Sequence, residues 1–165
     1  MNRRGFTLIE LLISVILFGL IATFMYGAID QMRHAQRFYE KKQRALMENE
    51  KTRSLLYDDL IHAKKVTITG NHPYYNVVAI DETQHALYGG DLVNVIWLVL
   101  KESNRLIRLE SVNPLALPID PSLLYGIHVN EIVQGCKTFR VYESEKGYLA
   151  GIFSSGMSIM VEAPK

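Results

Sequence analysis

Cysteine is almost absent from this sequence, which has 165 residues and a single cysteine, Cys136. One cysteine excludes an intrachain disulfide, so the chain is not a small domain held together by disulfide bridges. An isolated cysteine usually behaves as a small hydrophobic side chain. We therefore expect Cys136 to be buried, without a redox or metal-binding role.

An excess of charge of either sign is lacking as well. The chain has 18 Lys and Arg residues against 17 Asp and Glu residues, which gives a formal net charge of +1. Proteins that bind nucleic acid through its phosphates usually carry a clear basic excess. We therefore do not expect nucleic acid as a partner.

Recognisable catalytic patterns are also missing. The sequence has no G-x-S-x-G, G-x-G-x-x-G or P-loop pattern, and its five histidines form no H-x-H or H-x-x-x-H pair. Asp81 and Glu82 could bind calcium in a loop, but they lack the ligand spacing of an EF-hand. Asp58 and Asp59 would point about 100° apart on a helix, which suits a solvated face better than a metal site. The sequence predicts no enzyme, no cofactor and no metal.

Charge and proline are both scarce in the long apolar run from Phe6 to Ile29, which contains one charged residue, Glu10, and no proline. A helix over this run would be on the order of 36 Å long at about 1.5 Å per residue, which is enough to cross a bilayer. Arg3 and Arg4 precede the run and favour a cytoplasmic N-terminus by the positive-inside rule. The rest of the chain would then lie across the membrane.

Glu10 is a functional candidate because an ionisable group inside a membrane segment is costly without a partner. The alternative is that Glu10 has no functional role, and that its carboxylate reaches the interface or stays protonated. Cleavage after Gly5 would give Phe6 a free α-amino group four residues before Glu10. That amine could pair with Glu10 in the same helix or in a neighbouring chain, and either pairing would lower the cost of burying both charges.

These N-terminal residues resemble a known signal. Arg3 and Arg4, then the segment Gly5-Phe6-Thr7-Leu8-Ile9-Glu10, then a long apolar helix are similar to the class III signal of type IV pilins and type II secretion pseudopilins. The resemblance implies that a prepilin peptidase removes the leader 1–5 by cutting between Gly5 and Phe6. It also implies N-methylation of Phe6 and a role for Glu10 in subunit docking.

Residues 30–64 continue the helix in the sequence-based prediction. They contain no proline, and apolar residues recur at helical spacing, so we expect one helix from Phe6 to about Lys64. The polar stretch 48–53 would be either a solvated turn of that helix or a short break. Five cations follow the membrane run, and a solvated face explains them better than contact with subunits, lipid head groups or DNA: Arg33, Arg37, Lys41, Lys42 and Arg44.

Residues 65–165 are expected to form a β-rich head. Strands are predicted at 66–69, 74–80, 86–88, 92–100, 105–112, 138–143, 148–153 and 157–161, with a proline-rich loop at 113–121 and an ambiguous segment at 123–133. The run 92–100 is apolar almost throughout, so both of its faces should be covered. The expected fold class is α+β and pilin-like: a long N-terminal helix, with a membrane half at 6–29 and an amphipathic half at 30–64, packed on an antiparallel head.

Within that family the chain most resembles a minor pseudopilin of the J type, in which two curled antiparallel sheets pack against the helix. The resemblance implies a place in the tip complex that starts a type II secretion pseudopilus. The implied partners are the prepilin peptidase, other minor and major pseudopilins, the inner-membrane assembly platform and, before assembly, the lipid bilayer. The implied location is the bacterial inner membrane, as a single-pass protein with a periplasmic head.

Two other interpretations stay open. A minor pilin of a type IV or competence pilus would share the same signal, and a basic patch on its head would favour it. A membrane-anchored binding domain that never polymerises would keep its first five residues.

Overall fold

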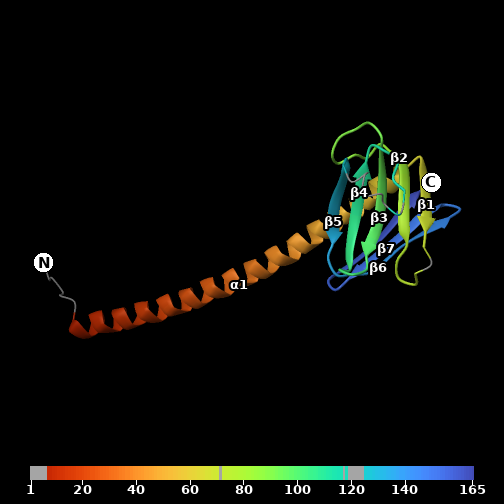
Figure 1. Ribbon diagram of the computed structural model, residues 1–165. Helices are drawn as coiled ribbons and strands as arrows, with labels where there is room; N and C mark the ends of the chain where they lie inside the picture. The colour runs from red at the N-terminus through yellow and green to blue at the C-terminus, as the bar shows by residue number, and fades with distance from the viewer. Residues whose placement is uncertain (1–6, 71, 117, 119–124) are drawn as a thin grey trace. The chain divides into compact units, whose positions relative to one another are not determined.

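The computed structural model of the chain describes residues 7–70, 72–116, 118 and 125–165 (Figure 1). The chain divides into two compact units, Met1–Met47 and Glu48–Lys165. The secondary structure consists of one helix, α1, followed by strands β1 to β8 in the described residues. The α+β class with an antiparallel β-rich head is confirmed.

Helix α1 runs from Leu8 to Ile61 without interruption. No proline occurs before Pro73, so nothing in the sequence removes a hydrogen bond from the helix interior. The polar stretch 48–53 is helical throughout, so the alternative of a break there is excluded. At the end of α1, His62 donates both its backbone amide and its ring Nδ1 to the carbonyl of Asp58, at 3.2 and 2.9 Å. These bonds satisfy a carbonyl of the last turn.

The second unit contains two antiparallel sheets. The five-stranded sheet has its strands in chain order: β1 (Lys65–Thr69), β2 (Val77–Thr83), β3 (Val93–Leu100), β4 (Arg105–Ser111) and β5 (Ile127–Val133). The three-stranded sheet is also a meander of β6 (Cys136–Ser144), β7 (Gly147–Ser154) and β8 (Met157–Pro164). Figure 1 shows the blue strands β6 and β7 as a layer behind the five-stranded sheet.

The predicted strands at 92–100 and 105–112 form a hairpin, and so do those at 138–143 and 148–153. Leu100 pairs with Arg105 across the turn 101–104, and Ser144 pairs with Gly147 in the β6–β7 turn. Gly147 has a φ of 151°, and a Cβ at that position would lie 2.1 Å from the carbonyl oxygen of Ala163. Only glycine fits where the hairpin passes β8 so closely.

Two local predictions differ from the structure, and one ambiguous segment is resolved in part. Residues 86–88 form no strand, because the amides of Leu87 and Tyr88 bind a side chain instead of a neighbouring strand. Strand β2 starts at Val77 and not at Tyr74, and Tyr75 makes an isolated bridge to Phe139 of β6. The ambiguous segment 123–133 contains β5, while 117 and 119–124 lie outside the described residues.

The main core lies between the two sheets and the last turns of α1. Leu56 and Leu60 of α1 pack in one cluster with Trp97 of β3 and Phe139 of β6, and all four are almost fully buried. The opposite face of β3 contributes Ile96 to a second cluster with Ile107 and Leu109. Strand β3 is therefore covered on both faces, as its continuous apolar sequence predicts.

Candidate functional site: the apolar helix, Glu10 and a buried ionic cluster

The first part of α1 exposes nearly all of its apolar side chains. Phe18 and Phe24 are 74% and 77% exposed, and the most apolar window of the helix is not buried at all. The helix is long and apolar enough to cross a membrane. An exposed apolar surface of this length suits contact with lipid or with other apolar helices.

Glu10 lies in the first turn of α1, and Thr7 immediately precedes the helix. The amides of Glu10 and Leu11 donate to the carbonyl of Thr7 at 3.1 and 3.3 Å, and Thr7 Oγ1 donates to Glu10 Oε2 at 3.4 Å. Thr7 and Glu10 have the T-x-x-E spacing of a capping box, and the bond between them joins the two side chains. The positive end of the helix dipole also favours a carboxylate there. The T-x-x-E spacing of Thr7 and Glu10 is already visible in the sequence. The sequence-based hypothesis for Glu10 rests instead on its charge within an apolar run.

The other N-terminal site residues cannot be placed beside Glu10. Arg3, Arg4, Gly5 and Phe6 lie outside the described residues. Cleavage between Gly5 and Phe6, methylation of Phe6 and the pairing of its amine with Glu10 therefore stay predictions.

A buried ionic cluster in the second unit was not predicted. Asp59, near the end of α1, is 0% exposed and accepts four hydrogen bonds. Arg108 of β4 donates from Nε to Oδ2 at 2.7 Å and from a terminal nitrogen to Oδ1 at 2.9 Å. Trp97 Nε1 and His85 Nδ1 complete the shell at 2.7 and 2.9 Å. The expectation that Asp58 and Asp59 form a solvated face is therefore wrong for Asp59, because its helix face meets the sheet.

Glu110 is the second carboxylate of this cluster. It pairs with Arg108 and accepts the backbone amides of Leu87 and Tyr88 at 3.0 Å. Burial raises the pKa of Glu110, but the bonds from Arg108 and the two amides outweigh burial and hold that pKa below its ordinary value. Glu110 therefore stays ionised and fixes the loop 85–88 onto β4.

His85 is the most accessible member of the cluster, with a side chain that is 26% exposed. Its hydrogen bond to Asp59 raises the pKa of the imidazole, against the opposing effects of burial and of Arg108. With His85 neutral, two carboxylates face one guanidinium, and protonation of His85 balances the charge. Both oxygens of Asp59 are fully occupied, so this carboxylate has no free position for a metal ion.

The remaining candidates from the sequence are possible metal ligands and the single cysteine. No group of three or more His, Cys, Asp or Glu side chains could hold a metal within the residues that the structure describes. Cys136 is 1% exposed, and burial raises the pKa of its thiol to about 11. The prediction that Cys136 is a buried hydrophobic side chain is confirmed.

The comparisons with known proteins concern the N-terminus. The family model described as the prokaryotic N-terminal methylation motif matches residues 1–26. No curated protein and no solved structure matches the chain. The motif implies processing by a prepilin peptidase and assembly with other pilins, and the long apolar helix suits an inner-membrane anchor. The chain thus carries a type IV pilin-like prepilin signal, followed by an apolar helix and a β head.

Proposed function

We propose that this chain is a structural minor pseudopilin of a type II secretion system, which joins the tip complex of the pseudopilus and helps to initiate its assembly. The observation that carries the proposal is the methylation motif at residues 1–26, which opens a helix whose apolar side chains are exposed. The chain acts by assembling with other subunits and not as an enzyme.

The N-terminus supplies the assembly mechanism. Cleavage after Gly5 frees the α-amine of Phe6, which is then methylated but keeps its positive charge. Glu10 lies in the first turn of α1, where its carboxylate would meet that amine of a neighbouring subunit. Pairing of the two charges offsets the cost of removing each from water. The apolar part of α1 then exchanges lipid contacts for contacts with neighbouring helices.

The head supports a J-type subunit more weakly. Two antiparallel sheets enclose the last turns of α1, and Cys136 has no intrachain partner that could form a disulfide. The presence of Glu10 favours a place below the outermost subunit of the tip, which in that system usually lacks this carboxylate.

A minor pilin of a type IV or competence pilus is the second candidate, because the same motif opens those proteins. Residues 48–165 contain 11 Lys and Arg against 14 Asp and Glu, a net charge of −3. This balance gives no electrostatic support for a head that takes up DNA.

The deciding experiment is a pulldown from native membranes with intact-mass analysis of the captured chain. A mass that begins at N-methylated Phe6, together with secretion pseudopilins, supports the proposal. The same mass with pilus subunits supports the second candidate. An unprocessed chain without such partners contradicts both, and leaves a membrane-anchored domain that does not polymerise.

A matched pair of glycine variants controls the processing step. Gly5→Ala should sharply reduce cleavage. Gly19→Ala places the same methyl group in the apolar helix, where a Cβ would meet nothing within 4 Å, and should be cleaved normally. Normal cleavage of Gly5→Ala would contradict the assigned cut site.

A further inference from the structure

The segment of α1 that follows the apolar run has an unusual charge distribution. Residues 30–47 contain five Lys and Arg and two Asp and Glu, a net charge of +3, while residues 48–165 carry −3. All seven of these charged side chains are exposed. The near-neutral charge of the whole chain therefore conceals a basic segment next to the membrane run.

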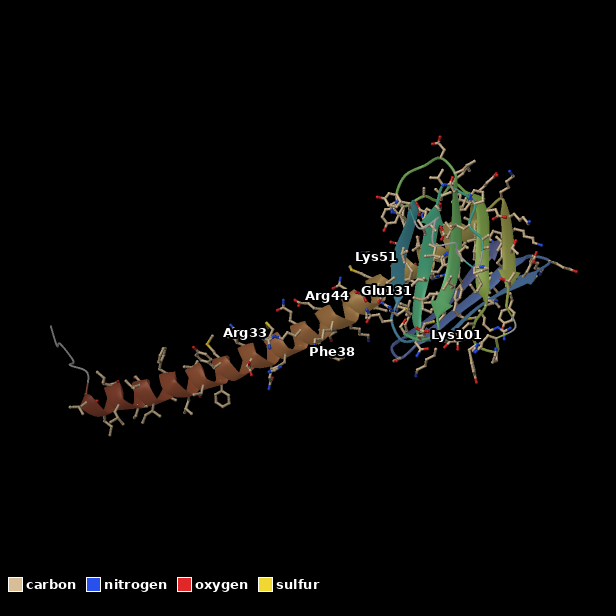
Figure 2. The ribbon with its side chains drawn as sticks, in the orientation of Figure 1. Arg33, Phe38, Arg44, Lys51, Lys101 and Glu131 are labelled. Atoms are coloured by element: carbon tan, nitrogen blue, oxygen red, sulfur yellow. The ribbon has the colours of Figure 1, made fainter. Side chains whose placement is uncertain are left out.

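Four of the five cations lie on one side of the helix. At about 100° per residue, Arg33, Arg37, Lys41 and Arg44 fall within an arc of about 80°. We call these four residues the basic stripe. Figure 2 shows the side chains of Arg33 and Arg44 projecting from α1. The larger apolar side chains of the segment lie mostly toward the opposite side by the same spacing, including Phe38, Tyr39 and Leu46.

The basic stripe is poorly neutralised within the chain. None of the ion pairs among the described residues includes a member of the stripe. The two nearby acids have other partners: Asp30 lies 3.7 Å from His34, and Glu40 accepts from Gln36 at 3.1 Å. Arg33, Arg37 and Lys41 follow one another at i,i+4, a spacing at which like charges destabilise a helix. An external anion would relieve this repulsion.

The position of the stripe along α1 indicates where that anion lies. Arg33 is four residues beyond Ile29, and Arg37 is eight beyond it. On a helix these residues lie about 6 and 12 Å past the apolar run, which spans the head-group layer and the water next to it. Lys41 and Arg44 lie farther along the same side, so a tilt of α1 toward the stripe brings them closer to the bilayer surface.

The five cations beyond the apolar run also oppose the orientation that prepilin cleavage requires, in which the N-terminus is cytoplasmic. The positive-inside rule counts Lys and Arg within about 15–20 residues of the ends of a membrane segment. Five follow the apolar run of this chain and two, Arg3 and Arg4, precede it. Translocating the five is unfavourable, and an anionic surface on the far side would offset part of that cost.

We infer that the basic stripe binds anionic phospholipid head groups. These head groups belong to the membrane leaflet that surrounds the C-terminal end of the apolar run. The inference rests on the membrane anchoring in the proposed function, but not on the identity of the machine. Bound lipid holds the subunit at the bilayer surface before assembly. When the subunit leaves the membrane, the basic stripe exchanges lipid phosphates for other anions. Elevated salt therefore weakens the retention of the subunit at the bilayer surface.

The test measures lipid selectivity around the full chain in phosphatidylcholine vesicles. Spin-labelled phosphatidylglycerol or spin-labelled phosphatidylcholine is added in trace amounts, and the fraction immobilised by the protein is read from the spectrum. The parent chain should retain phosphatidylglycerol at least about fivefold better than phosphatidylcholine, the effect of roughly one cation near the surface. The preference should shrink in about 0.5 M salt, where charges are strongly screened.

Two variants assign the effect to the stripe. R33Q/R37Q/K41Q/R44Q should lose the selectivity while it still immobilises both lipids. K51Q/R53Q/K64Q/K65Q removes the same number of charges from the second unit and should keep it. Circular dichroism confirms that each variant is folded.

Four results would overturn the inference. The parent chain could retain both lipids equally, or the stripe variant could keep full selectivity. The stripe variant could also lose co-isolated subunits while the parent chain shows no lipid preference, which would assign the stripe to a protein partner.

If neither lipid is immobilised, the chain does not span the bilayer, and the anchoring in the proposed function fails with the inference. A processed chain that co-isolates with pseudopilins but lacks lipid selectivity would leave the proposed function standing.

Discussion

Arg108 and Asp59 form a two-point ion pair in which both side chains are 0% exposed. The pair joins the middle of β4 to the end of α1, and the indole of Trp97 donates to the same carboxylate. A buried pair of this kind is weak evidence for stability, because both ions lose their hydration. It links the last turns of α1 to the five-stranded sheet.

Removal of the Asp59 carboxylate should be strongly destabilising. Asp59→Ala leaves Arg108 buried with only Glu110 as a charged partner, so the free energy of unfolding should fall by about 3–5 kcal/mol. Trp97 is the single tryptophan and contacts Asp59, so its fluorescence during urea titration in detergent reports directly on this region.

The adjacent carboxylate provides the control for this experiment. Asp58 is half-buried and accepts a hydrogen bond from Ser54 at 3.1 Å. Asp58→Ala should cost less than about 1 kcal/mol. Equal losses in the two variants would show that the buried pair has no special weight.

Stability should depend on pH through His85. The pKa of His85 is raised in the folded protein, mainly by its hydrogen bond to Asp59, and the ordinary value is 6.5. The stabilisation is therefore fully present below about pH 6.5 and is lost as the pH rises through the folded pKa. The free energy of unfolding should therefore decrease over the interval from about pH 6.5 to the raised pKa of His85 in the folded protein.

Two histidine variants isolate this effect. His85→Gln should flatten the pH dependence of unfolding over that interval. His62→Gln changes an exposed histidine at the end of α1 and should retain the parent slope. A slope that survives in His85→Gln would assign the titration to another group.

Asn76 should protect one edge of the three-stranded sheet. Its side-chain amide donates to the carbonyl of Val141 at 2.7 Å, and its side-chain oxygen accepts the amide of Val141 at 3.0 Å. Asn76→Ala leaves both groups of Val141 unpaired, so we expect a loss of about 2–4 kcal/mol and a tendency to self-associate.

Urea titration and sedimentation velocity in detergent measure these two consequences for Asn76→Ala. Asn113→Ala removes an exposed asparagine in a loop and serves as the control. A monomeric Asn76→Ala chain with parent-like stability would refute the role of Asn76 at the edge.

Local sequence patterns predicted the elements whose causes are local. The absence of proline before Pro73 permits the full length of α1, and the apolar run at 92–100 predicts a β3 that is buried on both faces. The Asp59 cluster was missed because its partners His85, Trp97 and Arg108 lie far along the chain, on a loop and two strands. Two adjacent acids on an amphipathic helix suggest a solvent-facing position unless the sheet that covers one of them is known.

The segment 123–133 was ambiguous for the same reason. Strand β5 alternates poorly, and His128, Val129 and Glu131 are exposed. Its strand conformation comes from pairing with β4, where Arg108 and Glu110 lie opposite Asn130 and His128. Pairing with a neighbour, and not its own propensity, determines that edge strand.

Glu10 has two separable roles, and one substitution distinguishes them. Its side-chain oxygen accepts a hydrogen bond from Thr7 Oγ1, and the side-chain oxygen of glutamine can accept the same bond. Its pairing with the amine of a neighbouring Phe6 needs the negative charge. Glu10→Gln should therefore be processed and inserted like the parent chain but should assemble poorly, as Glu10→Ala should.

The measurement is the amount of chain in sheared or cross-linked fibres, normalised to the processed chain in the membrane. Intact mass confirms that cleavage after Gly5 is unchanged in both variants. If Glu10→Gln assembles normally while Glu10→Ala does not, the hydrogen bond with Thr7 is what assembly requires, because that bond survives loss of the charge. The pairing with Phe6 would then be wrong, and Glu10 would act only through its contact with Thr7.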